Sequence, residues 1–158
     1  MLLRPGDQAP DFDVVDHKSQ AVRLADFRGK KVVVLYFYPK DFTTICTAES
    51  CGFRDMYQTL AGAGVEVIGI SLDSNDAHRR FAKQYELPFS LVSDGDKGLT
   101  RRYGALSTIR SFLGLAKRLT YVIGLDGRIA GVFEGELSAK PHLEGVKALV
   151  ATLTGKRP

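Results

Sequence analysis

One run of residues, 31–38, constrains the fold more than any other part of the chain. It reads Lys-Val-Val-Val-Leu-Tyr-Phe-Tyr, so seven aliphatic or aromatic side chains follow one another without a polar break. An apolar run without alternation is typical of a strand that is buried on both faces, as in the centre of a parallel sheet. Pro39 ends the run, because proline cannot donate a ladder hydrogen bond. The run therefore predicts an α/β protein with a layer on each face of its sheet.

Helical and strand patterns alternate after this central strand. Helices are expected at about 44–61, after a cap at Ser74, at 97–103 and at 141–152, and strands at 65–71, 90–92, 119–125 and 128–133. The Asp126-Gly127 pair predicts a hairpin turn between the last two strands. Residues 12–24 read as two short strands around a polar turn, and residues 105–116 are expected to be irregular. This order favours parallel strands joined by helices, with an antiparallel edge.

Length and composition exclude several classes of protein. The 158 residues suffice for one compact domain, 1–158, with its own core. No apolar run approaches the roughly 20 residues that span a bilayer, so no membrane association is expected. The first residues lack the apolar region of a secretory signal, which favours a cytoplasmic location. The net charge is +4, but the basic pairs are scattered among acidic residues, so no nucleic-acid partner is expected.

The two cysteines of the chain, Cys46 and Cys51, both lie where the first long helix begins. A cysteine in a first helical turn has its thiolate favoured by the helix dipole and by free backbone N–H groups. Thr43 or Thr44 can cap this helix, and a hydroxyl three residues before Cys46 can also reach the sulfur. Two cysteines in a reducing compartment are more often catalytic or redox-sensing than structural. The alternative is that Cys46 is a small buried apolar residue of the core.

Cys51 would be placed to react with an oxidised Cys46 only after a change of conformation. Positions i and i+5 of an ideal helix have Cα atoms ~8.7 Å apart, whereas a disulfide needs Cα atoms within about 7 Å. The first turns must therefore unwind before the two thiols can bond. Gly52 favours such an opening, because glycine weakens a helix. In the alternative interpretation Cys51 belongs to the core and Gly52 allows close packing.

No bound metal or cofactor is expected. The three histidines, His17, His78 and His142, lack ligand-like spacing and read as ordinary surface or cap residues. No glycine-rich phosphate loop is present. A cation near the sulfur would stabilise its anionic form. Arg54 lies about two helical turns from Cys46 and is too distant, whereas Arg118 opens a predicted strand and could reach the site. Spacing alone does not separate Arg118 from a surface arginine.

The segment Pro39 to Asp55 resembles the peroxiredoxin family, in its bacterioferritin-comigratory-protein or Q-type branch. The family motif Pro-x-x-x-Thr-x-x-Cys is matched by Pro39, Thr43 and Cys46, and the second cysteine follows five residues later. The similarity continues through residues 69–74, 87–94 and 118–123, so it extends over nearly the whole chain. One departure is the pair Thr44-Ile45, where the branch usually has proline and a small residue.

This resemblance implies a thioredoxin-like fold with a central mixed β-sheet flanked by helices and an N-terminal β-hairpin extension. It also implies thiol-dependent reduction of hydrogen peroxide and organic hydroperoxides. Cys46 would be the peroxidatic and Cys51 the resolving cysteine, with Thr43 positioning the peroxide, Pro39 shielding the site and Arg118 holding the thiolate. Thioredoxin or a similar dithiol protein would be the reductant, and the chain would be a monomer or a weak homodimer. The alternative function is a non-enzymatic redox sensor or binding module that uses the same disulfide as a switch.

Overall fold

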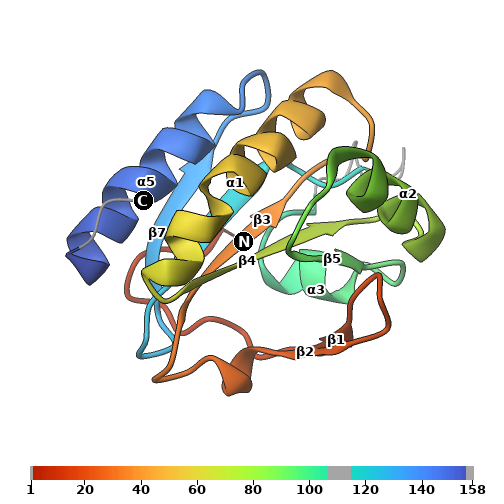
Figure 1. The fold of residues 1–158 in the computed structure, drawn as a ribbon. Helices are drawn as coiled ribbons and strands as arrows, with labels where there is room; N and C mark the ends of the chain where they lie inside the picture. The colour runs from red at the N-terminus through yellow and green to blue at the C-terminus, as the bar shows by residue number, and fades with distance from the viewer. Residues whose placement is uncertain (1, 107–114, 156–158) are drawn as a thin grey trace.

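The computed structural model describes residues 2–106 and 115–155. Five strands form one mixed sheet in the order β5-β4-β3-β6-β7, with helices packed against it (Figure 1). The strands of this sheet are β3 (Val32–Phe37), β4 (Val65–Ser71), β5 (Ser90–Ser93), β6 (Leu119–Ile123) and β7 (Ile129–Glu134). Strands β3, β4 and β5 run parallel, whereas β6 and β7 are antiparallel to their neighbours. The predicted α/β class and its antiparallel edge are confirmed.

The central strand β3 is buried along its whole length, and its side chains alternate between two apolar cores. Val34 and Tyr36 belong to the core under α1 (Thr44–Gly62), α2 (Asn75–Tyr85) and α5 (Lys140–Thr154). Val33 and Leu35 belong to the core on the other face, which includes residues of α3 (Gly98–Arg102). The unbroken apolar run in the sequence therefore contributes side chains to the cores on both faces of the sheet.

The N-terminal hairpin forms a separate two-stranded sheet from β1 (Asp13–Val15) and β2 (Ala21–Arg23), followed by a short 3-10 helix, η1 (Leu24–Asp26). It lies on the same side of the main sheet as α3 (Figure 1). The predicted two short strands around a polar turn are confirmed.

Element boundaries differ from the sequence predictions by a few residues. Strand β6 ends at Ile123, before the turn at Gly127, which adopts a positive φ of 79°. Helix α2 is capped by Ser74 as predicted, because the Ser74 hydroxyl accepts a hydrogen bond from the Ala77 N–H at 3.2 Å. Most of the segment expected to be irregular, 107–114, lies outside the described residues. Within the described parts of the chain, no helix is both long and apolar enough to cross a membrane.

Candidate active site

Cys46 lies in the first turn of α1, beyond the end of strand β3. The strand ends at Phe37 and the helix begins at Thr44, so the connecting loop brings Cys46 back over the carboxyl edge of the parallel strands. Ligands of α/β sheets bind at this edge. Cys46 is fully buried and carries a free thiol.

Arg118 lies beside Cys46 because β6 runs antiparallel to β3. Leu119 pairs with Phe37, so the residue before Leu119 lies at the end of the sheet where β3 finishes and α1 starts. The Arg118 Nη2 atom lies 3.1 Å from Cys46 Sγ, and the arginine is only 4% exposed. Arg118 is therefore buried beside Cys46 and is not a surface arginine.

A carboxylate that the sequence analysis did not single out holds this arginine. Glu49 is fully buried, and its Oε1 atom accepts a hydrogen bond from Arg118 Nη1 at 2.9 Å. Arg118 Nε donates to the Glu136 carbonyl at 3.4 Å, so the three nitrogens of the guanidinium face three different groups. One signal could have indicated Glu49: it lies three residues after Cys46, on the same face of the helix.

The charge of Glu49 depends on pH in the neutral range. Burial raises the pKa of Glu49 to about 7, even though the Arg118 cation acts in the opposite direction. Glu49 Oε2 lies 3.5 Å from Nδ1 of His142, a fully buried residue of α5. The His142 Nε2–H donates to the Gly135 carbonyl at 2.9 Å, which leaves Nδ1 to accept from Thr120 Oγ1 at 2.7 Å. Burial lowers the pKa of His142 and favours this neutral ring.

Thr43 and Pro39 flank the loop that leads into the helix. Thr43 occupies the N-cap position of α1, but its hydroxyl does not cap the helix and instead donates to the Lys40 carbonyl at 2.7 Å. The sequence offered Thr43 or Thr44 as the cap; Thr44 is already the first residue of α1, and Thr43 makes no side-chain capping hydrogen bond because its hydroxyl is turned toward the loop. Pro39 is buried at the beginning of this loop.

Cys51 is half-buried one turn further along α1, and the helix is continuous from Thr44 to Gly62. Both thiols are free, as expected for an intact helix. A methyl group added at Gly52 would lie 2.3 Å from Leu143 Cδ1 of α5. Leu143 would have to move to admit any larger residue, so Gly52 allows the present close packing of α1 on α5, in agreement with the alternative interpretation of Gly52.

The expectation that the three histidines are surface or cap residues is wrong. His17 is 2% exposed, and His78 and His142 are fully buried. Each ring has a hydrogen-bond partner in the protein interior. The spacing of the histidines along the chain does not reveal these partners. His78 binds Asp41, with 2.6 Å between Nδ1 and Oδ2.

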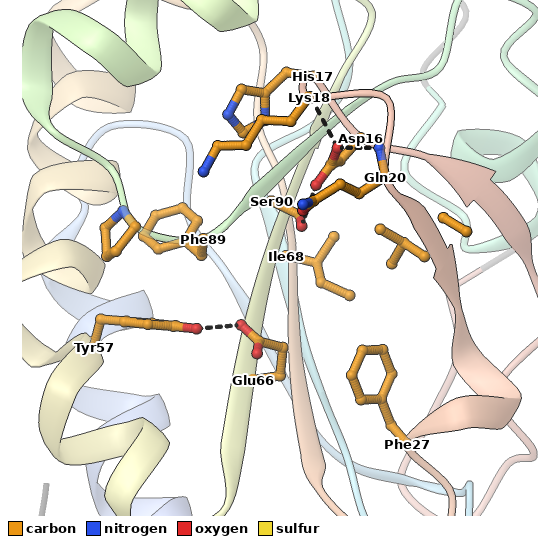
Figure 2. Close-up of a pocket in the computed structure, with 13 residues that line it drawn as sticks. Asp16, His17, Lys18, Gln20, Phe27, Tyr57, Glu66, Ile68, Phe89 and Ser90 are labelled. Carbon is orange, nitrogen blue, oxygen red and sulfur yellow. Dashed lines mark hydrogen bonds between the residues drawn. The ribbon is translucent and has the colours of Figure 1, made fainter.

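A separate pocket of about 230 Å³ lies between the N-terminal hairpin and helix α1. Figure 2 shows Tyr57 directed toward Glu66 on one side and Phe27 below the hairpin on the other. His17 lines its upper part, where Nδ1 of the ring accepts a hydrogen bond from the Leu91 N–H at 3.1 Å. Neither cysteine lines this pocket, so it is distinct from the site around Cys46.

Comparison with known proteins decides the family. A model of the AhpC/TSA family matches residues 5–132. The chain belongs to this family. It is 43% identical over 136 residues to the putative peroxiredoxin bcp of Coxiella burnetii, covering 84% of this chain and 89% of that protein. It is 39% identical over 148 residues to the chloroplastic peroxiredoxin Q of Sedum lineare, covering 94% of this chain and 78% of that protein.

The fold of this AhpC/TSA protein also matches solved structures. The crystal structure of peroxidoxin BcpB from Mycobacterium tuberculosis superposes with a TM-score of 0.85 at 31% identity, over 99% of each chain. The thioredoxin-like fold and the resemblance to the peroxiredoxin Q and Bcp branch are both confirmed. The chain is a peroxiredoxin of this branch, and peroxiredoxins are thiol peroxidases.

Proposed function

We propose that Cys46 is the peroxidatic cysteine of this thiol peroxidase. The Cys46 thiolate attacks one oxygen of the peroxide, forming an S–O bond while the O–O bond breaks. The leaving oxygen takes a proton and departs as water from hydrogen peroxide or as an alcohol from an organic hydroperoxide. The sulfur is oxidised by two electrons to a sulfenic acid, and the peroxide is reduced by two. The contact of 3.1 Å between Arg118 Nη2 and Cys46 Sγ is the observation that supports this role.

Arg118 supplies the positive charge that the reaction needs. A guanidinium beside the sulfur favours the thiolate, and negative charge that develops on the leaving oxygen is stabilised by the same cation. Glu49 fixes the orientation of the Arg118 guanidinium through its contact with Nη1, which leaves Nη2 directed at the sulfur. Thr43 would position the peroxide at the start of the helix, and Pro39 would shield the sulfur from solvent.

Cys51 is the proposed resolving cysteine. The Cys51 thiolate attacks the sulfur of the Cys46 sulfenic acid, an S–S bond forms, and the oxygen leaves as water after taking a proton. The first turns of α1 must unwind for this step. Thioredoxin or a similar dithiol protein then reduces the disulfide by exchange, which returns both thiols. A reducing compartment such as the cytoplasm supplies such a protein.

Peroxide-dependent oxidation of NADPH, coupled through thioredoxin and its reductase, tests this function. Wild type is expected to sustain NADPH oxidation over many turnovers, and Cys46→Ser is expected to abolish it while the fold remains intact. Substantial turnover by purified Cys46→Ser would contradict the role of Cys46. Stoichiometric oxidation of the wild type without repeated turnover would instead support the redox-sensor alternative.

A further inference from the structure

The loop between β3 and α1 is tied to the rest of the molecule by a second buried cluster of polar groups, centred on Asp41 and His78. Asp41 lies in this loop, two residues before Thr43, and is 3% exposed. Its Oδ2 atom lies 2.6 Å from Nδ1 of His78 in α2, and its Oδ1 atom accepts a hydrogen bond from the Tyr38 hydroxyl at 2.5 Å. Its backbone N–H donates to Asp73 Oδ2 at 2.9 Å. One residue thus connects the loop to β3, to α2 and to the end of β4.

His78 completes the connection through its second nitrogen. Its Nε2 atom lies 3.2 Å from the Val92 carbonyl of β5, so both ring nitrogens face hydrogen-bond acceptors. The ring is therefore held between the Asp41 carboxyl group on one side and the Val92 carbonyl on the other. The pair has 0% and 1% side-chain exposure, so water does not compete for these contacts.

The residue after Asp41 shows that the loop conformation is constrained. Phe42 has a positive φ of 66°, a left-handed backbone conformation that is unfavourable for an L-residue with a side chain. Its ring packs against two rings of α2, with centroids 5.2 Å from Phe81 and 6.5 Å from Tyr85. A strained conformation persists only where the surroundings determine it. Here the Asp41 contacts before it and the ring contacts of Phe42 itself supply that constraint.

We propose that Asp41 and His78 are positioning residues for the peroxide reaction, a proposal that rests on the role proposed for Cys46. They hold the loop of residues 39–43 against α2 and β4, and so fix the point at which α1 begins. The position of Cys46 beside Arg118 depends on that point, because Cys46 lies in the first turn. The contacts of Asp41 hold the loop before α1 and do not involve the first turns of the helix, so the loop would be the fixed end of the conformational change.

The test compares Asp41→Asn and His78→Asn with a matched pair in the N-terminal hairpin. Asp16 and His17 are also a buried Asp and His, each 2% exposed, and they too are attached to β5. The rate constant for sulfenic acid formation is measured by stopped flow, with urea unfolding of each variant. A misplacement near 1 Å costs up to a hundredfold in rate. We therefore expect the loop variants to react about tenfold to a hundredfold more slowly, and Asp16→Asn and His17→Asn to react within about twofold of wild type.

Two further variants keep the test decisive if a buried charge change prevents folding. Tyr38→Phe removes only the hydroxyl that donates to Asp41, and Tyr103→Phe removes a comparable hydroxyl that donates to the Pro10 carbonyl on the other face of the sheet. We expect Tyr38→Phe to slow sulfenic acid formation by about threefold to tenfold and Tyr103→Phe to leave it unchanged. The double variant of Asp41 and His78 should lose less than the product of the two single losses, because the contact between the two side chains is already broken in each single variant.

The proposal is overturned if the Asp41, His78 and Tyr38 variants react with peroxide at the wild-type rate. It is equally overturned if their rate losses follow their stability losses in the same proportion as in the hairpin variants. These outcomes are separate from a failure of the proposed function, which would appear as an unreactive wild type or an active Cys46→Ser.

Discussion

Arg118 Nη2 lies 3.1 Å from Cys46 Sγ, although the two residues are 72 positions apart in the chain. Antiparallel pairing of β6 with β3 brings them together, and the contact is buried from solvent. A charged contact in a desolvated site is stronger than the same contact in water. The rates expected for variants of Arg118 and Cys46 therefore follow from this contact.

Replacing Arg118 by alanine should slow sulfenic acid formation by about a hundredfold, the usual effect of removing one donor that stabilises developing charge. Arg118→Lys should recover only part of the loss, because one ammonium nitrogen cannot occupy the three positions that Nε, Nη1 and Nη2 take beside Glu136, Glu49 and the sulfur. Stopped-flow mixing with peroxide measures the rate. Arg23→Ala, at an exposed ion pair with Asp13, is the control and should react as wild type does. Equal rates in Arg118→Ala and wild type would refute the proposed role.

Thr43→Val should slow the same step by about tenfold while leaving the overall fold unchanged. The valine removes the hydroxyl that donates to the Lys40 carbonyl and keeps the side-chain shape. Thr43→Ser should retain most of the activity. Thr44→Val, at the next position, which is also exposed, is the matched control. If the Thr43 and Thr44 variants behave alike in stopped flow, Thr43 has no particular role in peroxide binding.

Glu49→Gln should change how stability depends on pH. Burial raises the pKa of Glu49 from 4.5 to about 7, so between these values the native state keeps a proton that the unfolded state has lost. The free energy of unfolding therefore falls as pH rises through this window, by up to about 3 kcal/mol. Glu49→Gln lacks this contribution. His142 acts in the opposite direction, since burial lowers its pKa, but it is present in both proteins.

Urea unfolding of reduced wild type and Glu49→Gln at pH 5, 6, 7 and 8 measures this difference. The stability of wild type relative to Glu49→Gln should decrease from pH 5 to pH 7 and then level off. A difference that is constant across these pH values, or that rises with pH, would show that Glu49 is ionised throughout.

Gly52 requires a compensated variant, because alanine at this position would clash with Leu143. The informative comparison is Leu143→Ala against Gly52→Ala/Leu143→Ala, in which the space for the methyl group is already open. Alanine favours the helix over glycine by about 1 kcal/mol, so the double variant should form the disulfide about fivefold more slowly. Its sulfenic acid formation should be unchanged. Identical rates of disulfide formation in the two proteins would show that helix softness at Gly52 does not assist the opening.

Local patterns in the sequence predicted the elements of this fold well, and long-range contacts account for most of what they missed. The apolar run of β3 and the cap at Ser74 depend on neighbouring residues, so the sequence alone revealed them. The buried positions of Glu49 and His78 depend on Arg118 and Asp41, which are distant in the chain. A charged or polar residue reads as exposed until its buried partner is known, so a prediction from the sequence places the three histidines at the surface.

The central claim is that Cys46 is oxidised first and that Cys51 resolves it. Intact mass spectrometry of reduced protein after one equivalent of hydrogen peroxide tests both parts. Wild type should lose about 2 Da as the disulfide forms, Cys51→Ser should gain about 16 Da as sulfenic acid, and Cys46→Ser should remain unchanged. A gain of about 16 Da in Cys46→Ser with an unreactive Cys51→Ser would contradict the account, because the order of the two cysteines would then be reversed.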